Sequence, residues 1–481
     1  MEPQPPRTAA TPNGARTFVA LLVNTAIANV STMFLWFALT FWIYLETRNV
    51  LSTAVIGAAL MLFVALSSMF FGTLVDRFRK KPVMVWGTGV ALVVFLLDAL
   101  LFFAVGEAAI VDLSGPWFWI FATVMLAGAV VEQLRGITLS TAVTLLVPDD
   151  RRANANGLVG MVEGVTMLVT SVFSGLAVGL LGMGWTLVIG VSAVAISFGH
   201  LLTLRIDEPR VVAADPETAP TGWVDIRGGW RAVRGAHGLL FLVFFTMLNN
   251  FVGGVYMALM DPYGLELMRV EVWGVVFALA STGFIAGGAV VGKLGLGRNP
   301  TRTMLLVAAA MGVVGMVFAV REWAWLYVLG IWVYMALVPA VEASEQTVIQ
   351  RVVPYGQQGR VFGFAKTFEA AAAPVTSLLI GPIAEFLVIP HMRTPEGQRQ
   401  WAWLLGEGEA RGIALIFVVG GIVTIALALG AMLMPQYRAI SRQYAASAPP
   451  AVPEPPAGAA DPQAGPGRPA PARGPEPSAD A

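Results

Sequence analysis

Long, continuously apolar segments recur along the chain and are separated by short polar stretches. A transmembrane helix needs about 20 such residues, and twelve segments are long enough. They lie near 18–44, 52–74, 82–105, 117–146, 154–181, 183–204, 238–260, 272–292, 302–320, 323–351, 361–389 and 410–434. Apolar residues do not alternate with polar ones, so the pattern indicates helices instead of a β-barrel. We predict an all-α membrane protein with twelve transmembrane helices in two pseudo-symmetric six-helix halves.

The composition agrees with this prediction and excludes several kinds of site. Hydrophobic residues make up 57% of the 481 residues and charged residues only 12%, whereas soluble domains carry about 25% charged residues. The net charge is zero, so no basic field indicates nucleic acid. The chain has no cysteine, and its three histidines are far apart (His200, His237 and His391). We therefore expect no metal site and no cofactor.

The distribution of basic residues predicts the topology. With both termini inside, 22 of the 30 Lys and Arg residues fall on the cytoplasmic side and six on the outside. The remaining two, Arg135 and Lys366, lie within predicted helices. Cytoplasmic loops carry such an excess, so we predict a multi-pass protein of the plasma (inner) membrane with both termini in the cytoplasm.

The predicted helices divide the chain into five regions. These are a cytoplasmic N-terminus (1–16), an N-terminal six-helix bundle (17–204), a central cytoplasmic loop (205–237), a C-terminal six-helix bundle (238–436) and a Pro/Ala-rich cytoplasmic tail (437–481). The arginine-rich end of the central loop forms either an amphipathic surface helix or a solvated linker. The tail carries few large apolar side chains, so we expect it to be disordered.

The two halves share an internal repeat. An offset of 206 residues aligns Val147-Pro148 with Val353-Pro354, Gly157 with Gly363, Glu163 with Glu369 and Gly175 with Gly381. An offset of 220 aligns Asn29 with Asn249 and Gly72 with Gly292. Duplicated halves are typical of secondary transporters, which bind substrate between the halves near the midplane.

A conspicuous motif follows the second predicted helix. It reads Gly72-Thr-Leu-Val-Asp76-Arg77-Phe-Arg-Lys-Lys81-Pro. This segment resembles the loop signature of the major facilitator superfamily, Gly-x-Leu-Ala-Asp-Arg-x-Gly-Arg-Lys, with Arg79 in place of the second glycine. The resemblance implies the twelve-helix major facilitator fold and transport by alternating access. It also implies a gating role for Gly72, Asp76, Arg77 and Lys81, with Asp76 and Arg77 latching neighbouring helices.

A wider resemblance covers nearly the whole chain. Arg152-Ala-Asn-Ala-Asn156-Gly after Pro148, and Gly359-Arg360-Val-Phe-Gly after Pro354, look like the macrolide-efflux and enterobactin-exporter-like branch of the superfamily. Proton-driven drug antiporters typically carry a Gly-Pro pair in the fifth helix, where this chain has Gly175 without a proline.

Ionisable residues within the predicted helices are candidates for function, because they are costly in a bilayer. The central set contains five acids and two bases: Glu132, Glu163, Glu342, Glu345, Glu369, Arg135 and Lys366. This excess of three acids requires protons, a bound cation or carboxyl groups that are neutral. Asp98 lies in the outer third of the third helix.

Helices four and ten usually line the cavity in the superfamily, so the resemblance favours Glu132, Arg135, Glu342 and Glu345 as cavity residues. Glu132 and Arg135 are three apart on one face and could also neutralise each other. Asn29 and Asn249 lie in the other usual cavity helices. Glu163 and Glu369 occupy repeat-related positions and either take part in transport or join helices. Lys366 and Glu369 are also three apart.

We predict a monomeric, proton-coupled exporter of amphiphilic organic compounds, such as drugs, macrolides or siderophores, and no enzyme. Its partners are a small-molecule substrate, protons and the lipid bilayer. Two alternatives remain: a transporter of lysophospholipid or other lipid without proton coupling, and a non-transporting sensor that uses its Pro-rich tail. Gly287 to Lys293 matches the first part of a phosphate loop, but Leu294 replaces the Ser or Thr, so we expect no nucleotide site.

Overall fold

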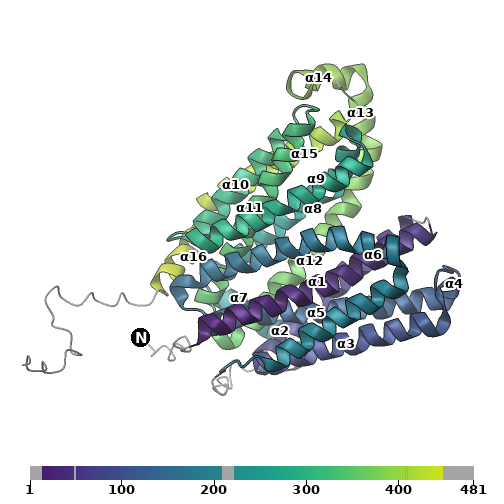
Figure 1. Ribbon diagram of the computed structural model, residues 1–481. Helices are drawn as coiled ribbons and strands as arrows, with labels where there is room; N and C mark the ends of the chain where they lie inside the picture. Colours follow the sequence, from purple (N-terminus) through teal and green to yellow (C-terminus); the bar gives the residue numbers. More distant parts are fainter. Residues whose placement is uncertain (1–12, 48–49, 209–221, 407, 409, 448–481) are drawn as a thin grey trace, which may run out of the picture. The chain divides into compact units, whose positions relative to one another are not determined.

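The computed structural model describes residues 13–47, 50–208, 222–406, 408 and 410–447 (Figure 1). Its N-terminal helices are α1 (Gly14–Thr47), α2 (Val50–Arg77), α3 (Lys80–Val105), α4 (Glu107–Ile110), α5 (Pro116–Leu146), η1 (Asp149–Arg151) and α6 (Arg152–Thr203). A connecting helix, α7 (Ile226–Gly235), follows. The C-terminal helices are α8 (Leu239–Leu267), α9 (Val270–Leu294), α10 (Pro300–Val317), α11 (Ala324–Val352), η2 (Tyr355–Gln357), α12 (Gln358–Ile383), η3 (Ala384–Val388), α13 (Ile389–Arg393), α14 (Pro395–Leu405), α15 (Arg411–Leu433) and α16 (Pro435–Ala446).

Among the described residues, eleven helices are long and apolar enough to cross a membrane. The predicted twelfth span is present within α6, whose 52 residues contain both the fifth and the sixth predicted helices. Gly182 separates these two parts with a φ of 78° and a ψ of 169°, a conformation that only glycine adopts readily. The predicted all-α fold is therefore confirmed.

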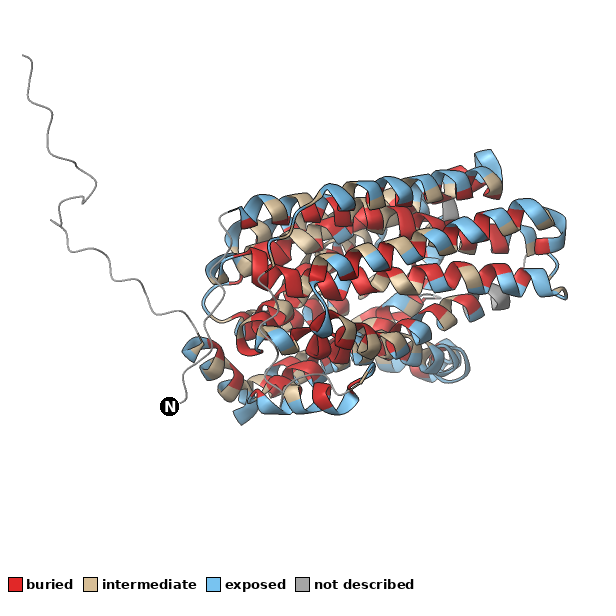
Figure 2. Cartoon of the chain, turned by 90° about the horizontal axis from the view of Figure 1, so that it is seen from below, coloured by how far each residue is buried: buried red, intermediate tan, exposed pale blue. Residues whose placement is uncertain are grey.

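The outer faces of the helices are apolar, as a lipid environment requires. Along α3, Val93, Leu97, Leu100 and Phe103 are each more than half exposed and recur at helical spacing. Figure 2 shows exposed residues along the outer sides of the helices and buried residues between them. A soluble protein avoids apolar surface of this extent, so these stripes face lipid.

Two helix pairs join the halves, and the internal repeat relates one pair to the other. In one pair, Gly72 of α2 lies against Gly363 of α12; in the other, Gly157 of α6 lies against Gly292 of α9. Gly157 and Gly363 are repeat equivalents, and so are Gly72 and Gly292. The glycines let the backbones approach closely, and the exchanged contacts follow from the predicted internal symmetry.

Two helices lie in regions predicted to be loop or tail. The arginine-rich end of the central loop forms α7, which settles the choice between helix and linker at that end. α16 extends to Ala446 with Ile440 and Tyr444 buried, so the segment 437–446 is helical and not disordered. The rest of the predicted tail, 448–481, lies outside the described residues.

We call the end of the bundles that carries Asp76, Asp149, Arg351 and Arg360 the basic end. The opposite end carries α4 in the N-terminal half and α14 in the C-terminal half, each far from α7 and α16 in Figure 1.

Candidate functional site

Asp76, the aspartate of the loop motif, forms the centre of a contact between the halves at the basic end. The backbone N–H groups of Gly359 and Arg360 donate to the Asp76 carboxylate, at 2.7 and 2.9 Å. The Arg360 side chain adds a hydrogen bond from Nε at 3.0 Å. Asp76 is 6% exposed, and a buried carboxylate is stable only when it is paired in this way.

A second aspartate, from the segment between the halves, binds the same arginine. Asp225 accepts a hydrogen bond from Arg360 Nη1 at 2.8 Å and caps α7 by accepting from Gly228 N at 2.8 Å. Its backbone N–H donates to Thr73 Oγ1 of α2. Arg360 therefore joins α2, α12 and the start of α7, and we call Asp76, Asp225, Gly359 and Arg360 the latch.

The helices of the latch are in backbone contact. A Cβ atom added to Gly72 would collide with the carbonyl oxygen of Gly359, and one added to Gly359 would collide with Gly72 and Asp76. Glycine at both positions is therefore what brings Asp76 within reach of the Gly359 and Arg360 N–H groups.

The other residues of the predicted gating motif lie beside the latch. Arg77 is exposed and its guanidinium lies over the Trp223 ring, 5.2 Å from the centroid. Lys81 donates to Leu202 O at 3.2 Å. The buried base is instead Lys80, which is 2% exposed and forms an ion pair with Glu208 at 3.7 Å.

Amide side chains make a further contact between the halves at the basic end. Asn156 of α6 donates to Thr347 and Gln350 of α11, both at 2.9 Å. Thr144 of α5 donates to Gln358 of α12 at 2.8 Å. The basic end is thus closed by both ionic and neutral hydrogen bonds.

Asp149 adds an ionic contact at this end. It pairs with Arg152 at 2.7 Å and with Arg351 of α11. Arg351 also lies over the Tyr444 ring, 4.0 Å from the centroid, and so connects α16 to the same contact.

Five of the predicted intramembrane charges come together in one cluster. Lys366 of α12 interacts electrostatically with Glu369, Glu342, Glu163 and Glu345. Glu163 comes from α6, Glu342 and Glu345 from α11, and Glu369 from α12. We call these five residues the carboxylate cluster. It draws on both halves and holds four acids for one base.

The cluster is graded from accessible to buried. Glu163 and Lys366 are exposed, Glu342 and Glu369 are half-buried, and Glu345 is 8% exposed. Glu163 lies within hydrogen-bonding reach of Glu342, and Glu345 of Glu369. The Thr246 hydroxyl of α8 also donates to Glu345 at 3.0 Å. Ionised carboxyl groups this close repel each other.

The remaining predicted charged pair lies inside the N-terminal bundle. Arg135 donates from Nε to Glu132 at 2.6 Å, from Nη1 to Asn24 at 2.7 Å, and also to Thr88. Asn24 in turn donates to Ser197 O at 2.8 Å. Glu132 and Arg135 are 7% and 2% exposed, and these hydrogen bonds all lie among α1, α3 and α5. This pair holds the bundle together, which is the mutual neutralisation that their spacing allowed.

Three further predicted residues lie outside these groups. Asp98 of α3 is fully buried, and its carboxyl oxygens have no hydrogen-bond partner among the described residues. Asn29 of α1 and Asn249 of α8 are both half-buried.

Sequence reasoning did not assign Asp225 or Gln350 to a site, and gave Arg360 only as part of a family pattern, because their partners are distant in sequence.

The comparisons with known proteins agree with this architecture. A profile of the Major Facilitator Superfamily matches residues 21–377. The chain belongs to the major facilitator superfamily. It is a multi-pass membrane transporter of that superfamily, and the resemblance drawn from the loop motif is confirmed.

Individual relatives of this superfamily member are distant. Macrolide efflux protein A of Streptococcus pyogenes is 20% identical over 386 residues, which cover 78% of this chain and 91% of that protein. A bacterial homologue of the iron transporter ferroportin, in an outward-facing state, has a TM-score of 0.61 at 14% identity. The human organic anion transporter MFSD10 (TETRAN) has a TM-score of 0.59 at 13% identity. The chain covers all of both structures, which cover 87% of it, and this likeness shows the fold alone.

Proposed function

We propose that this transporter exports amphiphilic organic amines and is driven by protons that enter through the carboxylate cluster. The observation that carries the proposal is the cluster itself, in which four glutamates from both halves lie close enough to Lys366 to interact with its charge. Its excess of acids over bases favours a cationic substrate or protons. The efflux relative, whose name states that it exports macrolides, supports the same direction of transport.

The basic end is proposed to face the cytoplasm, in agreement with the distribution of Lys and Arg. With the latch closed there, the described conformation would face outward. Protons would reach the accessible Glu163 first and the buried Glu345 last. Opening of the latch would then expose the cluster to the cytoplasm, where substrate and proton compete for the same carboxylates.

The roles within the cluster are assigned by burial and contact. Glu342 and Glu345 are proposed as proton carriers, because each lies within reach of a second carboxyl group. Lys366 is proposed to limit the negative charge when the protons leave. Glu132 and Arg135 are proposed to keep the N-terminal bundle rigid, so their part in coupling is indirect.

The test is efflux of a preloaded fluorescent lipophilic cation from cells that lack their own pumps, with and without a protonophore. We expect Glu342→Gln and Glu345→Gln to lower protonophore-sensitive efflux about tenfold or more, since a hydrogen bond to a charged group contributes about 1.5–3 kcal/mol. Glu385→Gln, an exposed glutamate in η3, is the matched control and should transport normally. Full pH-driven efflux by both cluster variants would contradict the proposal. Efflux that is insensitive to the protonophore would favour transport without proton coupling.

A further inference from the structure

The connecting helix α7 presents an apolar and basic face to the outside of the protein. Ile226 and Trp230 are 58% and 38% exposed, and Trp223 and Val224, just before the helix, are 62% and 50% exposed. Arg227, Arg231 and Arg234 are exposed on the same short helix, which contains no acidic residue. Ile226, Arg227, Trp230 and Arg231 line a surface recess of about 740 Å³.

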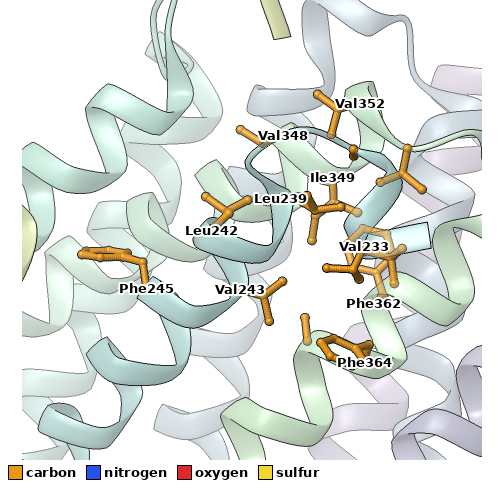
Figure 3. Close-up of a cluster of buried hydrophobic side chains, with 14 of the residues drawn as sticks. Val233, Leu239, Leu242, Val243, Phe245, Val348, Ile349, Val352, Phe362 and Phe364 are labelled. Carbon is orange, nitrogen blue, oxygen red and sulfur yellow. The ribbon is translucent and has the colours of Figure 1, made fainter. Parts of the chain in front are cut away.

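The other face of α7 is anchored in the protein core. Val233 is fully buried in an apolar cluster with residues of α8, α11 and α12, and Figure 3 shows it beside Phe362. The Trp230 ring packs against Phe364 of α12 with its centroid 6.0 Å away. The exposed face is therefore held in one orientation by the burial of Val233 and by the contact between Trp230 and Phe364.

The position of α7 places this face at the level of the lipid headgroups. Asp225, which caps the N-terminus of α7, is hydrogen-bonded to Thr73 and Arg360. These two residues lie near the ends of the membrane-spanning helices α2 and α12. Tryptophan beside arginine is typical of the membrane interface, where the ring reaches the acyl boundary and the guanidinium meets phosphate.

We propose that α7 is a binding site for anionic phospholipid headgroups of the leaflet at the basic end, with Arg227 and Arg231 as the phosphate ligands. Charge complementarity selects this occupant. The three arginines of the helix need an anionic partner, and its exposed apolar side chains need acyl chains, so an anionic phospholipid satisfies both. A soluble acidic segment would satisfy the arginines but leave Ile226 and Trp223 in water.

The same site is connected to the latch. Asp225 caps α7 through Gly228 and binds Arg360, so α7 must stay in place for Arg360 to keep both its aspartates. A lipid that holds α7 against α12 therefore stabilises the closed latch. Anionic lipid would slow the opening of the basic end.

Lipid binding is tested on the purified full-length protein in a non-ionic detergent. Phosphatidylglycerol or phosphatidylcholine is added at equal concentrations and bound lipid is counted by native mass spectrometry. Each arginine near an anionic surface contributes about 1 kcal/mol, so Arg227→Gln with Arg231→Gln should weaken phosphatidylglycerol binding roughly thirtyfold. The control, Arg438→Gln with Arg442→Gln, removes the same charge from exposed positions of α16 and should change binding little.

Equal binding of the two lipids would overturn the proposal, and so would equal losses in the two double variants, since either result means that α7 is not a specific site. Displacement of phosphatidylglycerol by an acidic peptide at equal charge would also overturn it, in favour of a protein partner. The proposal is supported if the protein binds phosphatidylglycerol more tightly than phosphatidylcholine, and if this preference is lost in the Arg227 and Arg231 double variant but kept in the Arg438 and Arg442 control.

The link to the latch is tested with Ser68→Cys, because the chain has no natural cysteine. Ser68 of α2 is fully buried where this helix lies against Gly363 of α12. A maleimide therefore reacts there only when the basic end opens. Phosphatidylglycerol should slow the labelling severalfold, and Asp225→Asn should remove that effect while lipid still binds. An unchanged lipid effect in Asp225→Asn would separate the lipid site from the latch.

Discussion

Gly72 shows how one residue sets the separation of two helices. A methyl group there meets the backbone of Gly359, which cannot move aside as a side chain could. We expect Gly72→Ala to destabilise the latched protein by about 1–3 kcal/mol, seen as a lower Tm in detergent. Gly57→Ala, in the same helix with open space around it, is the control and should leave Tm nearly unchanged or slightly raised. Equal losses of Tm in the two variants would mean that the contact with Gly359 is not responsible.

Asp76 should be more important for conformation than for folding. Asp76→Asn keeps the shape of the side chain but leaves the buried Arg360 with a weaker partner, and loss of one member of a buried ion pair costs about 3–5 kcal/mol. We expect the basic end to open more often, so that maleimide labelling of Ser68→Cys becomes much faster. Asp150→Asn, an exposed acid at the same end, should label at the normal rate. Slow labelling in Asp76→Asn would exclude the latch role.

Sequence reasoning identified Asp76 but not its partner. The motif predicted that Asp76 and Arg77 latch neighbouring helices, but it did not predict which base pairs with Asp76. That base is Arg360, 284 residues away. A local pattern reports which residues are unusual at a helix end. It does not predict which helix of the other half packs there. Only the packing of α12 and of the segment before α7 brings Arg360 and Asp225 to this place.

At the scale of elements, α6 consists of two helical spans that meet at a kink at Gly182. Gly182 holds a positive φ where the fifth span ends and the sixth begins. Any other residue would be strained there by about 1–3 kcal/mol, so Gly182→Ala should lower Tm. Gly179→Ala lies in regular helix with nothing near its Cβ and should be neutral or stabilise slightly. A Tm for Gly182→Ala as high as that of Gly179→Ala would show that the turn tolerates a side chain.

The two exchanged interfaces between the halves differ in charge. The α2–α12 contact has the ion pair of Asp76 and Arg360. At the position equivalent to Arg360, the α6–α9 contact has Asn154, which donates to Gly292 O at 3.0 Å. The internal repeat thus preserved the close approach of the helices but only one ionic latch. The α2–α12 side is therefore the side on which a charge or an attached lipid can control opening.

For the whole molecule, hydropathy predicted every span, because the length of an apolar segment is set by the bilayer alone. It could not predict that Glu163 joins Glu342 while Glu132 stays with Arg135, since that depends on how far each helix is rotated about its axis. Rotation is fixed by packing with distant helices, so the candidate site was predicted as a set of residues and not as a cluster.

Alternating access requires that contacts between the halves at the basic end break in every cycle, whereas contacts within a half persist. Asn156 and Gln350 lie in different halves, and Asn299 and Ser441 lie in the same half. We expect a short, reducible bifunctional thiol reagent to stop efflux in Asn156→Cys with Gln350→Cys, and a reductant to restore it. The same reagent on Asn299→Cys with Ser441→Cys should leave efflux intact, because that pair moves as one body. Continued transport with the first pair linked would mean that the halves need not separate at this end, and the closed latch would then be a structural feature and not a gate.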